Sequence, residues 1–319
     1  MKKVGIGIDI GGTGTQIGFV DKEGKVFLET SMSTLVGDTF EEYLDALYEV
    51  IEKAKAESEE EFEILGIGVG APNGNYYKGT IEFAPNLKWK GVINVTDQMS
   101  KKFGVPAVLT NDANAAAIGE MVFGGAKGMK NFIIITLGTG LGSGIVVNGE
   151  LVYGHDGFAG ELGHVRVEKN GRLCGCGRRG CLETYASATG IKRTAFEVMA
   201  DRNQETMLSK YSYDELTSYK IYEAAQNGDH IAREIFRKTG KILGEALADF
   251  IANGSPEAIF LFGGLAKAGD LILEPTEAAM EDSLLHIFKN KVKLRLSQLD
   301  EGNAAVVGAA ALAWNEFDN

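Results

Sequence analysis

The chain has 319 residues, a length that suits one large domain or two domains of about 150 residues each. Hydrophobic residues make up 45% and charged residues 24%, and the net charge is −12, which argues against an electrostatic nucleic-acid surface. No apolar run is long enough to span a membrane, and three closely spaced cysteines do not form the framework of a secreted disulfide protein. We therefore expect a cytoplasmic protein that binds neither nucleic acid nor membrane.

Glycine is the unusual component of the chain. There are 42 glycines but only five prolines, so the sequence is not a low-complexity Pro/Gly segment. Glycine weakens the interiors of helices and strands, so its abundance indicates loops in which a bare backbone is needed.

The first third of the chain alternates strand and helix patterns. An apolar strand at 4–10 meets a glycine-rich turn, and two further strands follow at 17–20 and 25–28. Thr39 and Glu42 form a capping box that opens an amphipathic helix. Further apolar runs then predict strands at 64–69 and 105–109, followed by an alanine-rich helix at 113–122.

The opening pattern then recurs. A strand at 132–136 is followed by a glycine-rich turn and a strand at 145–147, and Gly138-Thr139-Gly140 matches Gly12-Thr13-Gly14. Helices at 229–252 and 303–314 and a strand at 258–262 complete an α/β pattern. We expect two related α/β domains that face one another across a cleft, although an accidental match between two hairpins would look the same.

The glycine-rich turns are candidate phosphate sites, because successive backbone N–H groups can form an anion-binding nest. The sequence contains neither a P-loop nor a dinucleotide-binding fingerprint, since each turn is followed by a strand. Tight hairpins without a ligand are the alternative. Asp9, at the end of the first strand, fits either the water shell of a magnesium ion or a turn cap. A third candidate is the Gly263-Gly264 turn.

Asn111 and Asp112 stand at the end of a predicted strand, where open α/β sheets place ligand-contacting groups. Asp112 could accept the proton of an attacking hydroxyl in phosphoryl transfer. It could also cap the following helix, and the local sequence alone favours the cap.

A third group of residues combines acids, a histidine and thiols. Glu161 and His164 precede Cys174, Cys176, Cys181 and Glu183, and glycines separate the cysteines. One histidine and three thiols fit a tetrahedral zinc site whose four protein ligands make the metal structural. Three unrelated buried thiols are the alternative.

These motifs together resemble those of the ROK sugar kinases of the actin-like ATPase superfamily, over nearly the whole chain. The Asp9-Ile-Gly-Gly-Thr13 and Leu137-Gly-Thr-Gly140 segments resemble the two phosphate motifs of the family. The Ala84-Pro-Asn86 loop resembles a sugar-side loop. The segment from Glu161 to Glu183 resembles the family's zinc segment, which is the most specific of these matches.

The resemblance implies a role for each candidate. Asp112 would be the catalytic base on the sugar 6-hydroxyl, and zinc would be held by His164, Cys174, Cys176 and Cys181. Sugar hydroxyls would be bound by Asn86, Asn111, Asp112, Glu161, His164 and Glu183. ATP and Mg²⁺ would be bound by Asp9, Gly11, Gly12, Thr13, Gly138, Thr139, Gly140, Gly263 and Gly264.

The implied activity is ATP-dependent phosphorylation of a hexose, with glucose favoured. The alternatives are an N-acetylmannosamine, fructose or allose kinase, or a sugar-responsive regulator without its DNA-binding domain. We expect a small domain at 1–115 joined by the helix at 303–319, a large domain at 116–302, and a homodimer. The chain departs from the family pattern at Gly14, Asn73 and Leu265, where lysine or glycine is often found.

Overall fold

The computed structural model describes residues 1–299 and 303–318 and contains two five-stranded sheets of identical topology. The first sheet has the order β3-β2-β1-β4-β8, and the second has the order β11-β10-β9-β12-β13. In each sheet the first three strands in sequence pair antiparallel and the last two join in parallel. The repeated pattern confirms the predicted α/β class with two related halves.

The strands of the first sheet are β1 (Lys2–Ile10), β2 (Gly14–Val20), β3 (Val26–Ser33), β4 (Phe62–Gly70) and β8 (Ala107–Thr110). Those of the second are β9 (Phe132–Leu137), β10 (Leu141–Val147), β11 (Glu150–Leu151), β12 (Ala258–Phe262) and β13 (Lys293–Leu296). A small third sheet contains β5 (Gly74–Asn75), β6 (Thr80–Glu82) and β7 (Val92–Asn94). The two predicted glycine-rich turns each connect the first two strands of a main sheet.

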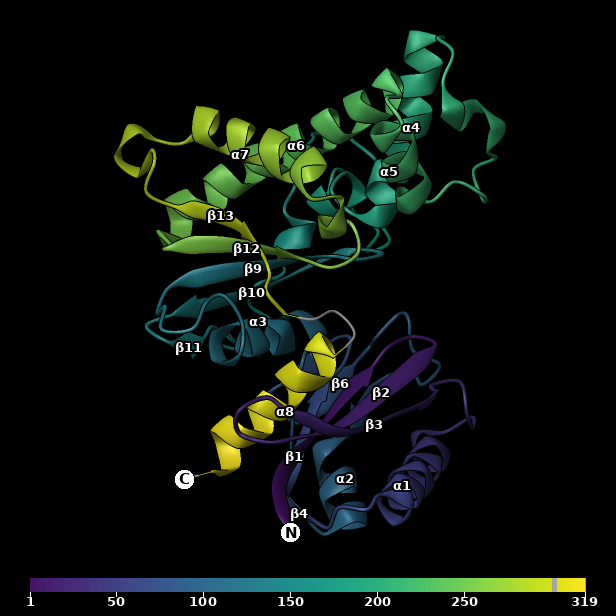
Figure 1. Ribbon diagram of the computed structural model, residues 1–319, viewed down its shortest axis with the longest axis vertical. Helices are drawn as coiled ribbons and strands as arrows, with labels where there is room; N and C mark the ends of the chain where they lie inside the picture. Colours follow the sequence, from purple (N-terminus) through teal and green to yellow (C-terminus); the bar gives the residue numbers. More distant parts are fainter. Residues whose placement is uncertain (300–302, 319) are drawn as a thin grey trace.

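Helices cover one outer face of each main sheet and fill the space between the sheets (Figure 1). Outside the first sheet lie α1 (Phe40–Glu57) and α2 (Thr96–Phe103), and α1 opens with the predicted Thr39–Glu42 capping box. The second half contains α4 (Ala188–Arg202), α5 (Ser218–Gln226), α6 (His230–Gly254) and α7 (Asp270–Ser283). None of the helices within the described residues is long and apolar enough to cross a membrane.

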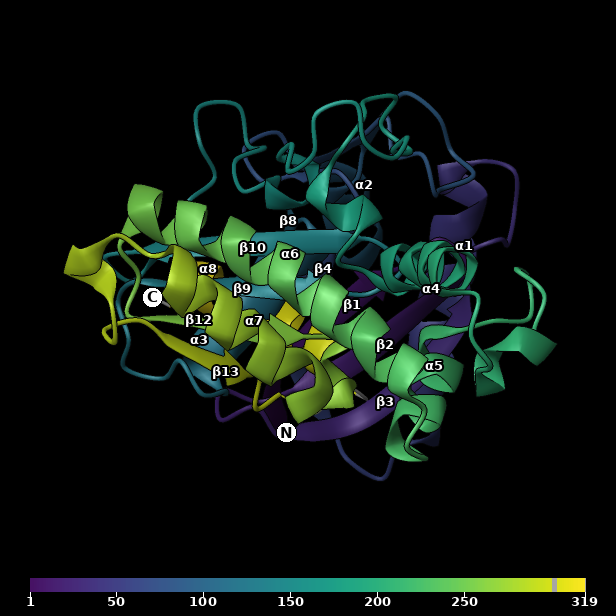
Figure 2. The same cartoon turned by 90° about the horizontal axis from the view of Figure 1, so that it is seen from above.

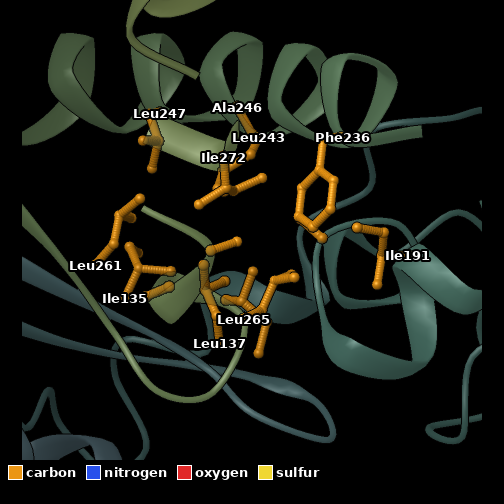
Figure 3. Close-up of a cluster of buried hydrophobic side chains, with 14 of the residues drawn as sticks. Ile135, Leu137, Ile191, Phe236, Leu243, Ala246, Leu247, Leu261, Leu265 and Ile272 are labelled. Atoms are coloured by element: carbon orange, nitrogen blue, oxygen red, sulfur yellow. The ribbon is translucent and has the colours of Figure 1, made fainter. Parts of the chain in front are cut away.

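The second sheet is packed against a large apolar core. Seen from above, α6 and α7 run side by side across β9, β10 and β12 (Figure 2). Figure 3 shows Leu137 and Leu261 from the strands meeting Phe236 of α6 and Ile272 of α7, all of them buried. Burial of each large apolar side chain contributes roughly 1.5–3 kcal/mol, so this layer holds the second half rigidly.

Two helices lie between the sheets, namely α3 (Asp112–Val122) and α8 (Ala304–Phe317) (Figure 1). Helix α3 contacts β9 and β10, whereas α8 contacts β1 and β4, and the two helices pack against each other. A Cβ atom on Gly7 would stand 1.9 Å from the Val306 carbonyl oxygen, and one on Gly68 would stand 1.8 Å from that of Ala309. Part of the glycine excess therefore lets α8 lie directly on the sheet.

Candidate active site

A cavity of about 460 Å³ lies between the two halves. Its walls come from the ends of β1 and β8, the start of α3, both glycine-rich turns and the segment that leads into Leu162–His164. Twelve of the predicted site residues line it, from both halves of the chain: Asp9, Gly11, Gly12, Asn86, Asn111, Asp112, Gly138, Thr139, Gly140, Glu161, Glu183 and Gly263.

Three of the residues predicted to bind sugar or nucleotide stand outside the lining of this cavity, as do the three predicted zinc-binding cysteines. Thr13 is exposed at the tip of the first turn, where its carbonyl accepts the Thr34 N–H at 3.0 Å. Gly264 is exposed just beyond Gly263. His164 lies behind Glu161, with its Nε2 atom 4.0 Å from Glu161 Oε2. These residues surround the cavity but do not form its surface.

The sequence analysis missed several lining residues, including Asn73, Ser143 and Gly160. Asn73 adopts a left-handed backbone (φ 53°) in a Pro-Asn-Gly turn, and its side-chain amide donates to the Glu82 carbonyl at 2.9 Å. The Ser143 hydroxyl donates to the Gly160 carbonyl and accepts the Leu162 N–H at 3.2 Å. The turn signal at Asn73 was visible in the sequence, whereas the Ser143–Gly160 contact joins residues with no shared motif.

Asn111, and not Asp112, caps helix α3. The Asn111 Oδ1 atom accepts the Asn114 N–H at 2.6 Å, and Asp112 is the first residue of the helix. The local-sequence interpretation of Asp112 as the cap is therefore wrong, because the preceding side chain already fills that role. Asp112 Oδ1 accepts the adjacent Ala113 N–H, at 2.8 Å.

Desolvation by the surrounding protein dominates the electrostatics of the carboxyl groups in the cleft, although the side chains of Asp112 and Glu161 still reach solvent. It raises the pKa of the Asp112 carboxyl, although hydrogen bonds from backbone N–H groups partly oppose this rise. Burial, followed by the charge of Asp112, raises the pKa of Asp9 to about 6. Burial also raises the pKa of Glu161, and the charges of Asp112 and Glu183 add to that rise while His164 lowers it. A cluster of carboxyl groups with raised pKa values in a cleft is typical of a functional site.

Glu183 links the two ends of the cavity. Its Oε2 atom accepts the Leu141 N–H at 3.4 Å, directly after the second glycine-rich turn. A Cβ atom on Gly140 would stand 2.5 Å from the same oxygen, so a larger residue there would force the Glu183 carboxylate to move away from the turn. A group bound at the turn and a group bound at Glu183 would thus be immediate neighbours.

The predicted metal ligands come together in the structure. One ligand atom from each of His164, Cys174, Cys176 and Cys181 lies within 4.8 Å of the others. Cys174 Sγ is 3.7 Å from His164 Nδ1, and Cys176 Sγ is 3.7 Å from Cys181 Sγ. Thiolates about 2.3 Å from a tetrahedral zinc ion would be about 3.8 Å apart, so the residues fit zinc. Four protein ligands make the site structural.

The cavity thus combines an amide-rich surface for phosphate with carboxylates that face the cleft and can meet a hydroxylated ligand. The backbone N–H groups of the glycine-rich turns can stabilise anionic oxygens, and Asp112 can accept a proton from a hydroxyl. This arrangement supports proton transfer from a small polyhydroxylated molecule that is bound next to a phosphoryl donor.

Comparison with known proteins agrees with this geometry. A glucokinase of Streptomyces coelicolor is 37% identical, covering 97% of this chain and 96% of its own. The crystal structure of a ROK family glucokinase from Streptomyces griseus, in complex with glucose and AMPPNP, superposes with a TM-score of 0.82 at 36% identity, covering 98% of this chain and 99% of its own. A xylose repressor of Caldicellulosiruptor bescii is 32% identical over 98% of this chain and 78% of its own.

The family model itself covers almost the full length of the chain, matching residues 5–316. With the duplicated sheets, these matches confirm the expected two-domain, actin-like α/β fold. The chain belongs to the ROK family.

Proposed function

We propose that this protein is a glucokinase that transfers the γ-phosphoryl group of ATP to the 6-hydroxyl of glucose. The observation that carries the proposal is the single cavity lined by Asp112, both glycine-rich turns and the acidic residues Glu161 and Glu183. The similarity to glucokinases over 96% or more of both chains supports the same conclusion.

Asp112 is the general base of the proposed reaction. Its carboxylate accepts the proton of the 6-hydroxyl as the oxygen attacks the γ-phosphorus, and the bond from that phosphorus to the β–γ bridging oxygen breaks. Asn111 supports this role, because it takes over the helix cap and leaves the Asp112 carboxylate available in the cavity. Burial favours proton acceptance, since it raises the pKa of the carboxyl toward the working pH.

ATP is held mainly by main-chain groups. The turns at Gly11–Thr13 and Gly138–Gly140 surround the phosphates, and Gly263-Gly264 lies beside the nucleoside. Asp9 would orient the water shell of Mg²⁺, and a bound Mg²⁺ would neutralise charge on the phosphates. Closure of the two halves around both ligands excludes water, which would otherwise compete as the phosphoryl acceptor.

Glucose is bound by side chains from both halves: Asn86, Asn111, Asp112, Glu161, His164 and Glu183. His164 would hold zinc through Nδ1, which lies next to Cys174, and present Nε2 toward Glu161 and the sugar. Zinc would hold the segment from Glu161 to Glu183 in place and take no part in the transfer.

A sugar-responsive regulator is the second candidate, because the xylose repressor is also a relative. The observation that favours the kinase is the sequence identity, which is 37% to the glucokinase and 32% to the xylose repressor.

An assay of ADP release tests the proposal over a panel of glucose, N-acetylmannosamine, fructose, mannose and allose, with a control that lacks sugar. We expect the highest kcat/KM for glucose, and product analysis should identify the 6-phosphate. A higher kcat/KM for another sugar would replace glucose as the substrate. No turnover on any sugar, with sugar binding intact, would support the regulator.

We also propose a small domain at 1–115 joined by the C-terminal helix, a large domain at 116–302, a cytoplasmic location and a homodimer. Residues 300–302 and 319 of these ranges lie outside the described residues. Light scattering of the purified protein tests the dimer.

A further inference from the structure

Arg172 stands between the cysteine segment and the residues around Glu183. It precedes Cys174 by two positions, and only 8% of its side-chain surface is exposed. The Arg172 charge is paired with Glu197 at the protein surface, where the Arg172 Nε and Nη2 atoms both donate to the Glu197 carboxylate. An arginine buried to this extent is rare unless its donors are satisfied.

The remaining contacts of the Arg172 guanidinium are with two carbonyl oxygens and one hydroxyl on either side of a short turn. Its Nη1 atom donates to the Thr184 carbonyl at 2.6 Å and to the Gly190 carbonyl at 3.1 Å. Its Nη2 atom donates to the Thr194 hydroxyl at 3.0 Å. The guanidinium therefore connects the residue that follows Glu183 to the first turns of α4, through the protein alone.

Aromatic packing fixes the same guanidinium from one side. The central carbon of the guanidinium lies 4.4 Å from the centre of the Tyr185 ring, and the Tyr185 hydroxyl accepts the backbone N–H of Arg172 at 3.0 Å. A Cβ atom on Gly171 would stand 2.2 Å from that hydroxyl, and one on Gly190 would stand 2.6 Å from the Tyr185 carbonyl carbon. The turn that carries Glu183 is therefore packed too closely around Arg172 to shift without breaking these contacts.

We infer that Arg172 is a positioning residue for glucose binding, which holds the Glu183 segment in place independently of zinc. The inference rests on the proposed function, because Glu183 is assigned there to a sugar hydroxyl. The metal would fix this segment from the side of Cys181, and Arg172 fixes it from the side of Thr184 and α4. Because Glu183 also meets Gly140, the segment must be held accurately for glucose and ATP to lie side by side.

Arg172→Lys tests this inference in the full chain. Lysine keeps the charge but loses the planar fork, so it cannot serve the Thr184, Gly190 and Thr194 oxygens together. We expect the Kd of glucose, measured by calorimetry, to rise about 10-fold or more, which corresponds to the loss of one or two charge-assisted hydrogen bonds. The KM for ATP should stay within about twofold, and zinc content per chain should be unchanged.

Arg179→Lys is the matched control. Arg179 lies in the same segment but is exposed and donates once, to the Gly171 carbonyl at 3.3 Å, so glucose affinity should be unchanged. Thr194→Val is a milder second variant that folds even if Arg172→Lys does not, and it should weaken glucose binding about two- to fivefold.

Unchanged glucose affinity in both Arg172→Lys and Thr194→Val would overturn the inference. Loss of zinc in Arg172→Lys would overturn it as well, because Arg172 would then act through the metal site. The wild-type protein separates this test from the proposed function: no glucose turnover by the wild type contradicts the kinase, while glucose binding still reports on Arg172.

Discussion

The carboxylate of Asp112 adds to the effect of burial on Asp9, and together they raise the pKa of Asp9 from its usual value of 3.8 to about 6. Both side chains line the cavity: Asp9 lies near the end of β1, and Asp112 is the first residue of α3. The protein thus holds two acidic groups close together where a magnesium ion and a transferred proton are expected. Such an arrangement favours function at the expense of stability.

Replacement of Asp9 by asparagine should stabilise the protein and abolish most of its activity. The raised pKa means that the folded state disfavours the charged carboxyl, so the wild type pays a penalty above about pH 6. The penalty, on the order of 3 kcal/mol, disappears as the pH falls from about 6 toward 3.8. Thermal unfolding without ligands should show a higher Tm for Asp9→Asn at pH 8 and a shrinking difference in acid. An equal or lower Tm at pH 8 would contradict the assignment.

Turnover should fall on the acid side of neutrality. Both Asp112 and Asp9 must be ionised, and burial raises the pKa of each, that of Asp9 to about 6. We expect kcat/KM to decline as the pH decreases through about 6, by up to about tenfold per pH unit. The profile is measured by direct detection of glucose 6-phosphate, so that coupling enzymes do not limit the rate. A flat profile down to pH 5 would be inconsistent with the two carboxylates.

The duplicated fold was predictable because both halves repeat a strand, a glycine-rich turn and a strand. The sequence analysis did not predict α7, because Pro275 interrupts its helical pattern. The structure accommodates the proline through tertiary packing: a Cβ atom on Gly240 of α6 would lie 2.7 Å from the Pro275 ring. The third sheet has strands of only two or three residues, too short for a periodic signal.

The candidate site was predictable where residues form motifs and was not where they meet only in space. The zinc ligands lie within one segment, so spacing indicated them directly. By contrast, local sequence favoured Asp112 as the cap of α3, and the structure shows that the equally suitable Asn111 fills this role. The contact between Gly140 and Glu183 joins two distant segments, and only the structure reveals it.

Removal of one metal ligand should weaken glucose binding more than ATP binding. Cys176→Ser takes away an exposed thiolate, so zinc content should fall well below one ion per chain. The Kd of glucose should rise severalfold, because the metal fixes the segment that carries Glu161 and Glu183, while Arg172 still holds part of it. Metal analysis and calorimetry on the same preparation check both effects. Full zinc occupancy, or metal loss with unchanged glucose affinity, would refute this role.

Gly140→Ala should affect both substrates. The added methyl group would meet Glu183 Oε2 at 2.5 Å, so the carboxylate must move away from the turn. We expect higher KM values for glucose and ATP together and a kcat reduced by about tenfold, as a small misplacement of reacting groups can produce. Gly254→Ala is the control, because a Cβ atom there meets nothing within 4 Å and the residue lies at the end of α6. A change in the KM of only one substrate would argue against a contact between Gly140 and Glu183 that serves both.

The turnover of Asp112→Asn with glucose and ATP tests most directly whether Asp112 is the general base. Asparagine preserves the size of the side chain and its hydrogen bond at the start of α3, but it cannot accept the hydroxyl proton. We expect kcat to fall by about 10² or more, while the Kd of glucose stays close to that of the wild type and the Tm does not fall, because burial disfavours the charged Asp112 carboxylate. Turnover near the wild-type value, with glucose bound normally, would contradict Asp112 as the base.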